Sequence, residues 1–200
     1  MNHEFYKKTT DIIGASLGLL VLAPFYPFII LAIKLESRGP VIVKLNRVSR
    51  GKIIKVYKFR SMVENAQEIK ASLAVFNERK DGSFFKIKKD PRVTGTGKYL
   101  RKFRIDEFPQ LVNVLKGELS LVGPRPHEPG EVSSYPPEFQ HIILAKAGVT
   151  GLSQVNGASS LPFMKELNLD DYYLKNQSLW LDLKIIIKTI LILFFDPTAI

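Results

Sequence analysis

The clearest pattern along the chain is an uncharged, apolar run from Ile12 to Ile33. As a straight helix this run would extend roughly 33 Å, close to the hydrocarbon thickness of a bilayer. A fully buried helix of a soluble protein is the alternative, but such a long run is unusual in a chain of 200 residues. The run leads into charged sequence rather than into a small-residue cleavage site, so it does not fit a signal peptide. The pattern therefore predicts a membrane-associated N-terminal helix.

Two prolines and basic flanks indicate how this helix meets the membrane. Pro24 and Pro27 each remove a backbone donor and bend a helix, and lysines or arginines lie on both sides of the run. A helix that enters one leaflet and returns to the same face fits both features, whereas a spanning helix with an outside N-terminus is the alternative. In either case the basic remainder belongs in the cytoplasm. We expect a re-entrant membrane helix over residues 1–35 and a cytoplasmic domain over residues 36–200.

The following segments predict a hairpin and then a helix. Two β-rich runs, Val41 to Leu45 and Ile53 to Phe59, flank the turn sequence Ser49-Arg50-Gly51-Lys52 and predict a short β-hairpin. Met62 to Asn77 has helical composition. The polar stretch after it holds Asp81-Gly82-Ser83, which is typical of a turn or loop.

The C-terminal stretch from Leu179 to Phe195 is rich in aromatic and aliphatic side chains. Asp182, Lys184 and Lys188 interrupt it, so it fits an amphipathic helix at the membrane interface rather than a spanning one. A helix of the protein core is the alternative, and the sequence does not choose between the two.

Composition narrows the function classes. The net charge of +10 and the pI near 9.7 favour an anionic partner: nucleic acid, phospholipid or a phosphorylated substrate. Cysteine is absent, which excludes disulfides and cysteine-based metal sites or nucleophiles. The three histidines lack zinc-ligand spacing. The glycines of Thr94–Lys98 form no Walker loop, because Arg92 stands where that loop needs glycine and Tyr99 where it needs serine or threonine.

Asp106 and Glu107 are the strongest candidates for chemistry. They open a short apolar segment in which Pro109 is tolerated only near a helix start and Gly117 is a natural stop. In the first helical turn, both carboxylates would be held ionised by the helix dipole. Neighbouring cations would attract a phosphate (Arg101, Lys102, Arg104, Arg125). Carboxylates beside such cations suit phosphoryl transfer through an acyl-phosphate. The plainer alternative is that Asp106 caps the helix and Glu107 is a solvated charge.

Two further segments are weaker candidates. Lys58 and Arg60 stand at the end of the second predicted strand, where they serve either a phosphate or simply the surface. The glycine-spaced segment Gly148–Gly157, which contains Gln154, is able to line a site with backbone amides. A β-turn region explains that segment equally well.

Taken together, these segments resemble the bacterial sugar transferases, and among them the small monotopic phosphoglycosyl transferases that act on polyprenyl phosphate. The resemblance covers nearly the whole chain and is densest around the Asp-Glu pair. It rests on the motifs Lys7–Ile13, Lys58–Met62, Asp90–Thr94, Leu100–Lys102, Asp106–Leu111, Asn113–Pro126 and Trp180–Ile185.

The resemblance implies a fold and an activity. The fold is α+β: a mostly helical monotopic membrane protein with a re-entrant N-terminal helix bent at Ala23-Pro24, a small β-hairpin and amphipathic interfacial helices. The activity moves a sugar 1-phosphate from a UDP-sugar to polyprenyl (undecaprenyl) phosphate and releases UMP. It implies a place at the bacterial inner membrane, with the catalytic domain (residues 36–200) on the cytoplasmic face, in the first membrane step of a surface glycan pathway.

The resemblance also assigns roles to residues. Asp106 is the expected nucleophile and a ligand of the cofactor Mg²⁺, and Glu107 assists it. Arg101 and Arg125 are expected to bind substrate phosphate. Further candidates are Lys58 and Arg60 for phosphate, Gln154 for the donor loop and Pro24 for the membrane bend. The expected partners are the UDP-sugar, the polyprenyl phosphate and the bilayer, without nucleic acid; a homodimer is left open.

Some positions depart from the common family pattern. Arg104-Ile105 stand where small polar residues are frequent, Ser153 where tryptophan is frequent, Ala158 where arginine is frequent and Ala23 where serine is frequent. None of these changes removes a catalytic group. The chain also lacks the additional N-terminal spans of larger relatives, so we expect the minimal form.

Other function classes fit less well. A basic membrane-surface protein that binds nucleic acid or anionic lipid explains the charge but not the block of carboxylates and arginines. A CDP-alcohol phosphotransferase would need several spanning helices and an aspartate-rich metal motif, which this sequence does not contain.

Overall fold

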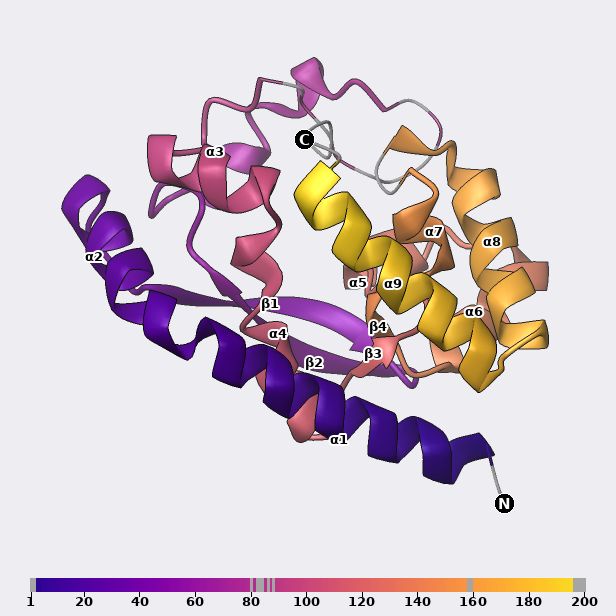
Figure 1. Ribbon diagram of the computed structural model, residues 1–200. Coiled ribbons are helices and arrows are strands. Elements are labelled where there is room, and N and C mark those ends of the chain that lie inside the picture. The colour runs from indigo at the N-terminus through magenta and orange to yellow at the C-terminus, as the bar shows by residue number, and fades with distance from the viewer. Residues whose placement is uncertain are drawn as a thin grey trace.

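A long N-terminal helical segment runs along one edge of the molecule (Figure 1). The computed structural model describes residues 3–79, 81, 85, 87, 89–157 and 160–195. The N-terminal segment consists of α1 (His3–Leu22), one 3₁₀ turn (Ala23–Phe25) and α2 (Tyr26–Glu36). Pro24 lies in the 3₁₀ turn and Pro27 in the first turn of α2, so the regular helix is interrupted where the prolines stand.

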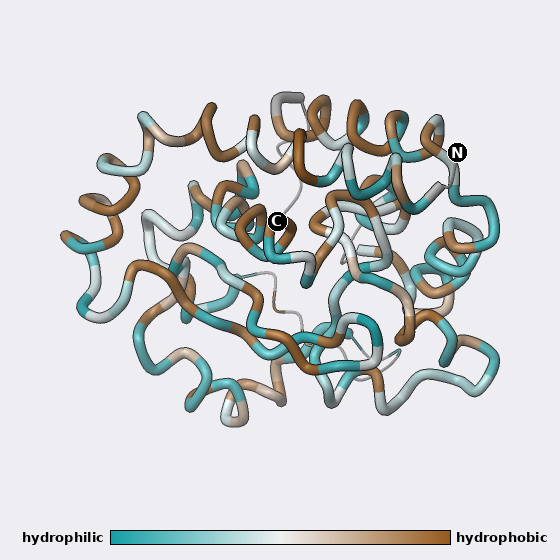
Figure 2. The backbone as a smooth tube through the Cα atoms, turned by 90° about the horizontal axis from the view of Figure 1, so that it is seen from below, coloured by the Kyte–Doolittle hydropathy of each residue, from teal (hydrophilic) through white to brown (hydrophobic). Residues whose placement is uncertain are grey.

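This segment buries one narrow stripe and exposes the rest. Over Glu4–Glu36 it is the one helix, among the residues that the structure describes, that is long and apolar enough to cross a membrane, and only 11% of its most apolar window is buried. The low burial argues against a core helix and is compatible with the predicted membrane association. Figure 2 shows apolar residues recurring along the segment. The large apolar side chains that are exposed on it are Phe5, Ile12, Ile13, Leu17, Leu20, Val21, Phe25, Phe28, Ile30, Leu31 and Leu35.

The buried stripe of α1 fixes this helix to the remainder of the chain. The buried Asp11 carboxylate accepts hydrogen bonds from Ser120 Oγ (2.8 and 2.9 Å) and from the backbone N–H of Leu121 (2.8 Å). Ala15, one turn later, is fully buried in the main core. Between them, a Cβ on Gly14 would lie 2.5 Å from the Leu121 side chain. The small residue therefore lets α1 approach closely.

The predicted β-hairpin is confirmed. Strands β1 (Ile42–Ser49) and β2 (Lys52–Phe59) pair antiparallel along their whole length. Arg50 and Gly51 form the turn with φ angles of 53° and 67°, the combination that a two-residue turn of type I′ requires.

The helix predicted over Met62–Asn77 is wrong. The structure has turns and two short 3₁₀ helices there, Glu68–Lys70 and Ala74–Phe76. Helical composition alone does not hold a helix in water without a packed face, and Val75 and Phe76 are 81% and 62% exposed. The turn expected at Asp81-Gly82-Ser83 falls mostly outside the described residues, as does Ala158.

A pair of parallel strands, absent from the sequence prediction, packs against the helix that follows the Asp-Glu pair. Strand β3 (Ser120–Val122) pairs with β4 (Gly148–Thr150). Glycine is needed at this crossing, because a Cβ on Gly148 would lie 2.1 Å from the backbone nitrogen of Gly123. The glycine-spaced segment is thus partly a strand, and it continues into the short helix α7 (Leu152–Val155).

The remaining helices lie before and after β3 in the chain. Helices α3 (Gly95–Lys102) and α4 (Gln110–Leu115) precede β3, and Gly117, with φ of 76°, follows the end of α4. After β3 come the short helices and the two long ones that complete the described chain. Their bounds are Pro129–Val132 (α5), Pro137–Phe139 (3₁₀), Gln140–Leu144 (α6), Phe163–Lys175 (α8) and Leu179–Phe195 (α9).

Helix α9 combines both alternatives that the sequence left open. Its Ile185 and Asp182 are buried in the core, whereas Trp180 and Leu191 are 65% and 50% exposed. The fold as described mixes many helices with two small sheets, which confirms the α+β, mostly helical prediction at that level.

Candidate active site

Asp106 and Glu107 lie in a tight turn that precedes a helix. The sequence placed them in the first α-helical turn, but they end the 3₁₀ helix Ile105–Glu107, and α4 begins later at Gln110 with Pro109 at its N-cap. The tighter turn follows from Arg104, whose φ of 52° reverses the chain direction after α3. Asp106 is buried, with 7% of its surface exposed, whereas Glu107 is half-buried.

A buried amide connects this turn to the hairpin. Asn113 of α4 accepts a hydrogen bond from the Tyr57 N–H (3.0 Å) and donates to the Lys55 carbonyl oxygen (2.8 Å). It donates a further bond of 2.6 Å to the Glu118 carboxylate. Because Asn113 is fully buried, these bonds hold α4 and β2 in register and set the distance between their functional side chains. Asn113 is a residue that sequence patterns did not single out, although an amide within an otherwise apolar helix is a signal of a buried polar contact.

Lys58, at the end of β2, reaches the Asp-Glu turn, while its predicted phosphate role stays a prediction. Its Nζ donates to Glu107 Oε1 at 2.6 Å, and the two form an ion pair. The side chains are 21% and 31% exposed, so water still screens the pair. Lys58 therefore belongs to the site by geometry, which favours the functional alternative for this residue over simple surface charge.

The two neighbouring carboxyl groups have opposite pKa shifts. Burial raises the pKa of Asp106, and the Glu107 charge adds to this, while Lys58 and Arg101 oppose it. Burial also raises the pKa of Glu107, but the charges of Lys58 and Arg125 outweigh burial and lower it below its usual range. One carboxylate is thus neutralised by a fixed cation while the other is left less hydrated and more basic, which increases nucleophilicity.

Arg125 is held by helix α8. Its backbone N–H donates to Asp170 Oδ2 (3.3 Å), and its Nε lies 4.0 Å from Glu166 Oε1. Glu166 also lies 3.2 Å from the Nε2 of His127, and burial raises the pKa of Asp170 to about 6. These buried α8 carboxylates were missed from the sequence, since residues so far apart in the chain meet only in the fold. They orient the Pro124–Pro126 loop.

The other predicted site residues have different surroundings. Arg101, in the last turn of α3, acts electrostatically on Asp106. Arg60 is directed elsewhere: its Nη2 donates to the Ser37 carbonyl oxygen (2.7 Å) between α2 and β1. Gln154 is buried near the parallel strands, where its Nε2 lies 3.5 Å from the Val149 carbonyl oxygen. A phosphate role for Arg60 and a donor role for Gln154 stay predictions.

The site contains too few carboxylates for an all-protein metal cage. In the described part of the chain, no group of three or more His, Cys, Asp or Glu side chains is arranged to hold a metal ion. Mg²⁺, however, is usually bound through one or two carboxylates together with substrate phosphates and water. Asp106 fits this role, since its carboxylate has no ion pair among the described residues, whereas Glu107 is engaged by Lys58.

Substitution of Lys58 by Met is expected to shift the acid limb of the pH–rate profile to higher pH. The Lys58 charge lowers the pKa of Asp106, so its removal raises that pKa, and any reaction that needs the ionised Asp106 carboxylate loses it to protonation at a higher pH than before. Partial protonation of the unpaired Glu107 reduces the effect without reversing it. Lys55→Met, an exposed lysine on the same strand, is the control and should leave the limb in place. An unchanged limb in Lys58→Met would separate this lysine from the titration of Asp106.

Comparisons with known proteins agree on one family. A sequence model of the family described as bacterial sugar transferase matches residues 2–196. The galactosyl transferase CpsE of Streptococcus agalactiae is 41% identical over 200 residues (99% of this chain, 44% of the relative). The undecaprenyl-phosphate galactose phosphotransferase of Salmonella typhimurium is 39% identical over 190 residues (93% and 40%). The exopolysaccharide production protein ExoY of Rhizobium meliloti is 34% identical over 188 residues (92% and 83%). The chain spans less than half the length of the first two relatives and most of the third.

Proposed function

The chain belongs to the bacterial sugar transferase family, and on that premise we propose that it is a UDP-sugar:polyprenyl-phosphate sugar-1-phosphate transferase. The observation that carries the proposal is the buried Asp106 carboxylate beside the Lys58–Glu107 ion pair. The relative from Salmonella typhimurium, named for phosphotransfer to undecaprenyl phosphate, supports the choice of acceptor.

The proposed reaction has two displacements at one phosphorus atom. An Asp106 oxygen attacks the sugar-bearing phosphorus of the UDP-sugar, the bond to the bridging oxygen breaks, and UMP leaves with the electron pair. A phosphate oxygen of the polyprenyl phosphate then attacks the same phosphorus, which releases the Asp106 carboxylate and forms the polyprenyl-diphosphate-sugar. Splitting the transfer suits a donor that arrives from water and an acceptor that stays in the bilayer.

The neighbouring residues reduce the electrostatic cost of these steps. An anionic nucleophile must approach an anionic diphosphate, and Arg101 and Arg125 supply positive charge next to it. Glu107, held ionised by Lys58, keeps the Asp106 carboxyl basic by its negative charge. Asp106 is the residue that would hold Mg²⁺, and the ion would supply positive charge against the diphosphate.

We further propose that the helix interrupted at Ala23–Phe25 is re-entrant, with the catalytic domain on the cytoplasmic face of the bacterial inner membrane. The interruption by Pro24 and the low burial of the segment support this topology. The name of the Rhizobium meliloti relative supports a place in surface glycan synthesis, at the first membrane step.

Cysteine labelling tests the topology, because the chain has no native cysteine. Single cysteines at the exposed positions Glu4 and Arg38 should both be protected from an impermeant maleimide in intact cells and labelled after permeabilisation. Pro24→Ala restores a backbone donor and removes a steric clash worth ~3 kcal/mol in a helix interior, so it should shift part of the population to a spanning form that labels at position 4. Labelling of Glu4→Cys in intact cells without Pro24→Ala would exclude the re-entrant form.

A panel of UDP-sugars tests the activity. With undecaprenyl phosphate and Mg²⁺, one or more donors should give UMP and a lipid-linked sugar diphosphate in equal amounts, and chelation of the metal should stop both. A basic surface protein that merely binds anionic lipid would retain the lipid but release no UMP, which would reject the proposal.

A further inference from the structure

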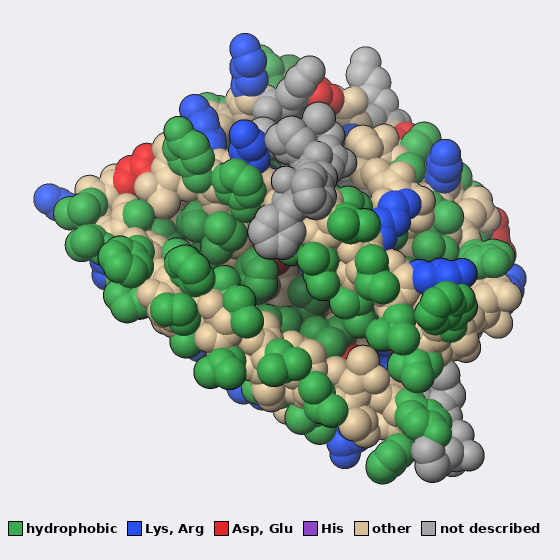
Figure 3. All heavy atoms as spheres, in the orientation of Figure 1, with side chains coloured by type: hydrophobic (Ala, Val, Ile, Leu, Met, Phe, Trp, Pro, Cys, Tyr) green, Lys and Arg blue, Asp and Glu red, His purple; other side chains and the backbone are tan. Residues whose placement is uncertain are grey.

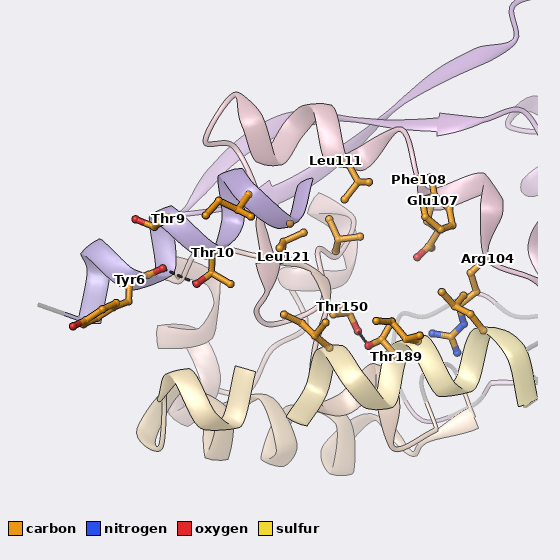
Figure 4. Close-up of a pocket in the computed structure, with 16 residues that line it drawn as sticks. Tyr6, Thr9, Thr10, Arg104, Glu107, Phe108, Leu111, Leu121, Thr150 and Thr189 are labelled. Atoms are coloured by element: carbon orange, nitrogen blue, oxygen red, sulfur yellow. Dashed lines mark hydrogen bonds between the residues drawn. The ribbon is translucent and has the colours of Figure 1, made fainter. Parts of the chain in front are cut away.

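An apolar cavity lies between α1 and α9, next to the Asp-Glu turn. It has a volume of about 440 Å³ and is lined by α1, α9, the start of α4 and the two parallel strands. In Figure 4 the cavity extends from Tyr6 and Thr9 at one end to Glu107 and Arg104 at the other. It is therefore continuous with the active site and shaped for an elongated ligand.

The threonine hydroxyls in the cavity walls are already hydrogen-bonded within the protein. Thr9 and Thr10 donate their hydroxyl hydrogens to the backbone carbonyls one turn earlier (3.0 and 2.8 Å). Thr150 and Thr189 share a hydrogen bond of 2.7 Å across the cavity wall. The surface offered to a ligand is accordingly hydrocarbon. A nucleotide sugar placed here would lose its hydration without compensating hydrogen bonds, whereas a hydrocarbon chain would gain from burial.

The polar end of the cavity holds a cation suited to a phosphate. Arg104 projects toward this end together with Glu107 (Figure 4). Its guanidinium forms no hydrogen bond or ion pair with any other described residue. Its backbone is in the left-handed region, with φ of 52°. This conformation is unusual for a residue with a side chain, and such residues cluster at functional sites.

The cavity opens on the apolar face of the molecule. Ile13 and Ile190 belong to its lining, and they are 55% and 48% exposed. Figure 3 shows a hollow in this face with hydrophobic side chains around it. A membrane lipid could enter from the bilayer without taking its hydrocarbon part through water.

From these observations we propose that the cavity holds the phosphate-proximal isoprene units of the acceptor, with Arg104 binding the acceptor phosphate beside Asp106. The proposal rests on the proposed function and deepens it by assigning the acceptor its own subsite. The volume admits a few isoprene units rather than a whole polyprenyl chain, so the remainder of the chain stays in the bilayer. A phospholipid acyl chain is the competing occupant, and the test below separates the two.

Bulky substitutions in matched pairs test the subsite. Ile190→Trp fills the cavity, whereas Ile187→Trp puts the same ring on the same helix at an exposed position outside the lining. We expect Ile190→Trp to raise the KM for undecaprenyl phosphate by roughly tenfold or more, because it displaces one or two isoprene units from apolar contact. Ile187→Trp should keep the wild-type KM. UMP released before lipid is added counts the functional active sites in each preparation.

The length and chemistry of the acceptor provide a second readout. The KM penalty of Ile190→Trp should be small for a one-isoprene phosphate, grow over the next few units and then stay constant. Phosphatidic acid should compete poorly with the polyprenyl phosphate. Equal penalties at all chain lengths, or strong competition by phosphatidic acid, would overturn the assignment of an isoprenoid subsite.

Substitutions that remove or keep the positive charge test the role of Arg104 in binding the acceptor phosphate. Arg104→Ala should raise the acceptor KM, and Arg104→Lys should recover much of the loss, because phosphate binding needs the cation. If Arg104 served only to reverse the chain direction after α3, the two variants would have equal KM values for the acceptor. That result would overturn this part of the proposal.

The outcomes separate the subsite from the proposed function. If the wild type releases UMP and both tryptophan variants have the same acceptor KM, the subsite is wrong and the function stands. If no UDP-sugar gives UMP with the wild type, the function itself fails. Should Ile190→Trp release no UMP because it misfolds, Ile13→Trp with its neighbour Ile12→Trp as control repeats the test from the opposite wall.

Discussion

Asp106→Asn is expected to fold normally and to lose sugar-phosphate transfer by roughly 10⁴-fold or more, which corresponds to about 5 kcal/mol of transition-state stabilisation. The amide has nearly the same size as the carboxyl group, so the turn at Ile105–Glu107 and its packing should persist. It has no anionic oxygen, however, and cannot form the acyl-phosphate. Burial of an uncharged amide at this position is also easier than burial of a carboxylate, so stability should not fall.

The measurement follows the donor half-reaction in the absence of lipid. The wild type mixed with its UDP-sugar should release about one UMP per active site. The peptide that contains Asp106 should then carry a sugar phosphate that hydroxylamine removes. Asp106→Asn should show neither the burst nor the adduct. The control is Asp171→Asn, the same substitution at an aspartate of α8 that contacts His141 and Lys175. It should keep both the burst and the adduct.

Glu107→Gln separates the role of Glu107 from that of Asp106. It removes the charge that helps to raise the pKa of Asp106 and leaves Lys58 unpaired, so Asp106 becomes less basic and transfer slows without disappearing. An Asp106→Asn enzyme that still transferred sugar phosphate at a substantial rate, or a wild-type adduct found on Glu107 instead, would refute the nucleophile assigned here.

Local patterns predicted the elements whose cause is local. The hairpin follows from β-branched runs around Arg50-Gly51, and Gly51 readily takes the positive φ angle that the turn requires. The end of α4 at Gly117 follows from the same conformational freedom. The helix predicted at Met62–Asn77 failed because a helix of this length needs a packed face, and no core reaches Val75 or Phe76.

Long-range contacts were beyond the reach of sequence patterns. The parallel pairing of β3 with β4 joins three-residue strands, too short for any periodicity. Glu166 and Asp170, the α8 carboxylates that hold Arg125, have a spacing that is ordinary in a helix. Their role follows only from the contacts that His127 and Arg125 make with them in the fold. Conversely, Lys58 was one of two equivalent cations in the sequence, and only the fold directs it to Glu107 and Arg60 to Ser37.

Arg125→Ala is expected to lower turnover by about 2–4 kcal/mol of transition-state stabilisation, or roughly 30- to 1000-fold. Its charge acts on Glu107 from a loop fixed by two prolines and by the α8 carboxylates, so a cation is preorganised where phosphate charge develops. Steady-state rates with the best donor measure the loss, and Arg38→Ala, at an exposed arginine, is the control. Arg125→Lys should recover only part of the rate, because a lysine cannot bind phosphate with two parallel donors. Glu166→Gln, which loosens the guanidinium without removing it, should have a smaller effect on the same step. A correctly folded Arg125→Ala enzyme with near-normal turnover would show that the Pro124–Pro126 loop is architectural and that the phosphate is stabilised by other cations.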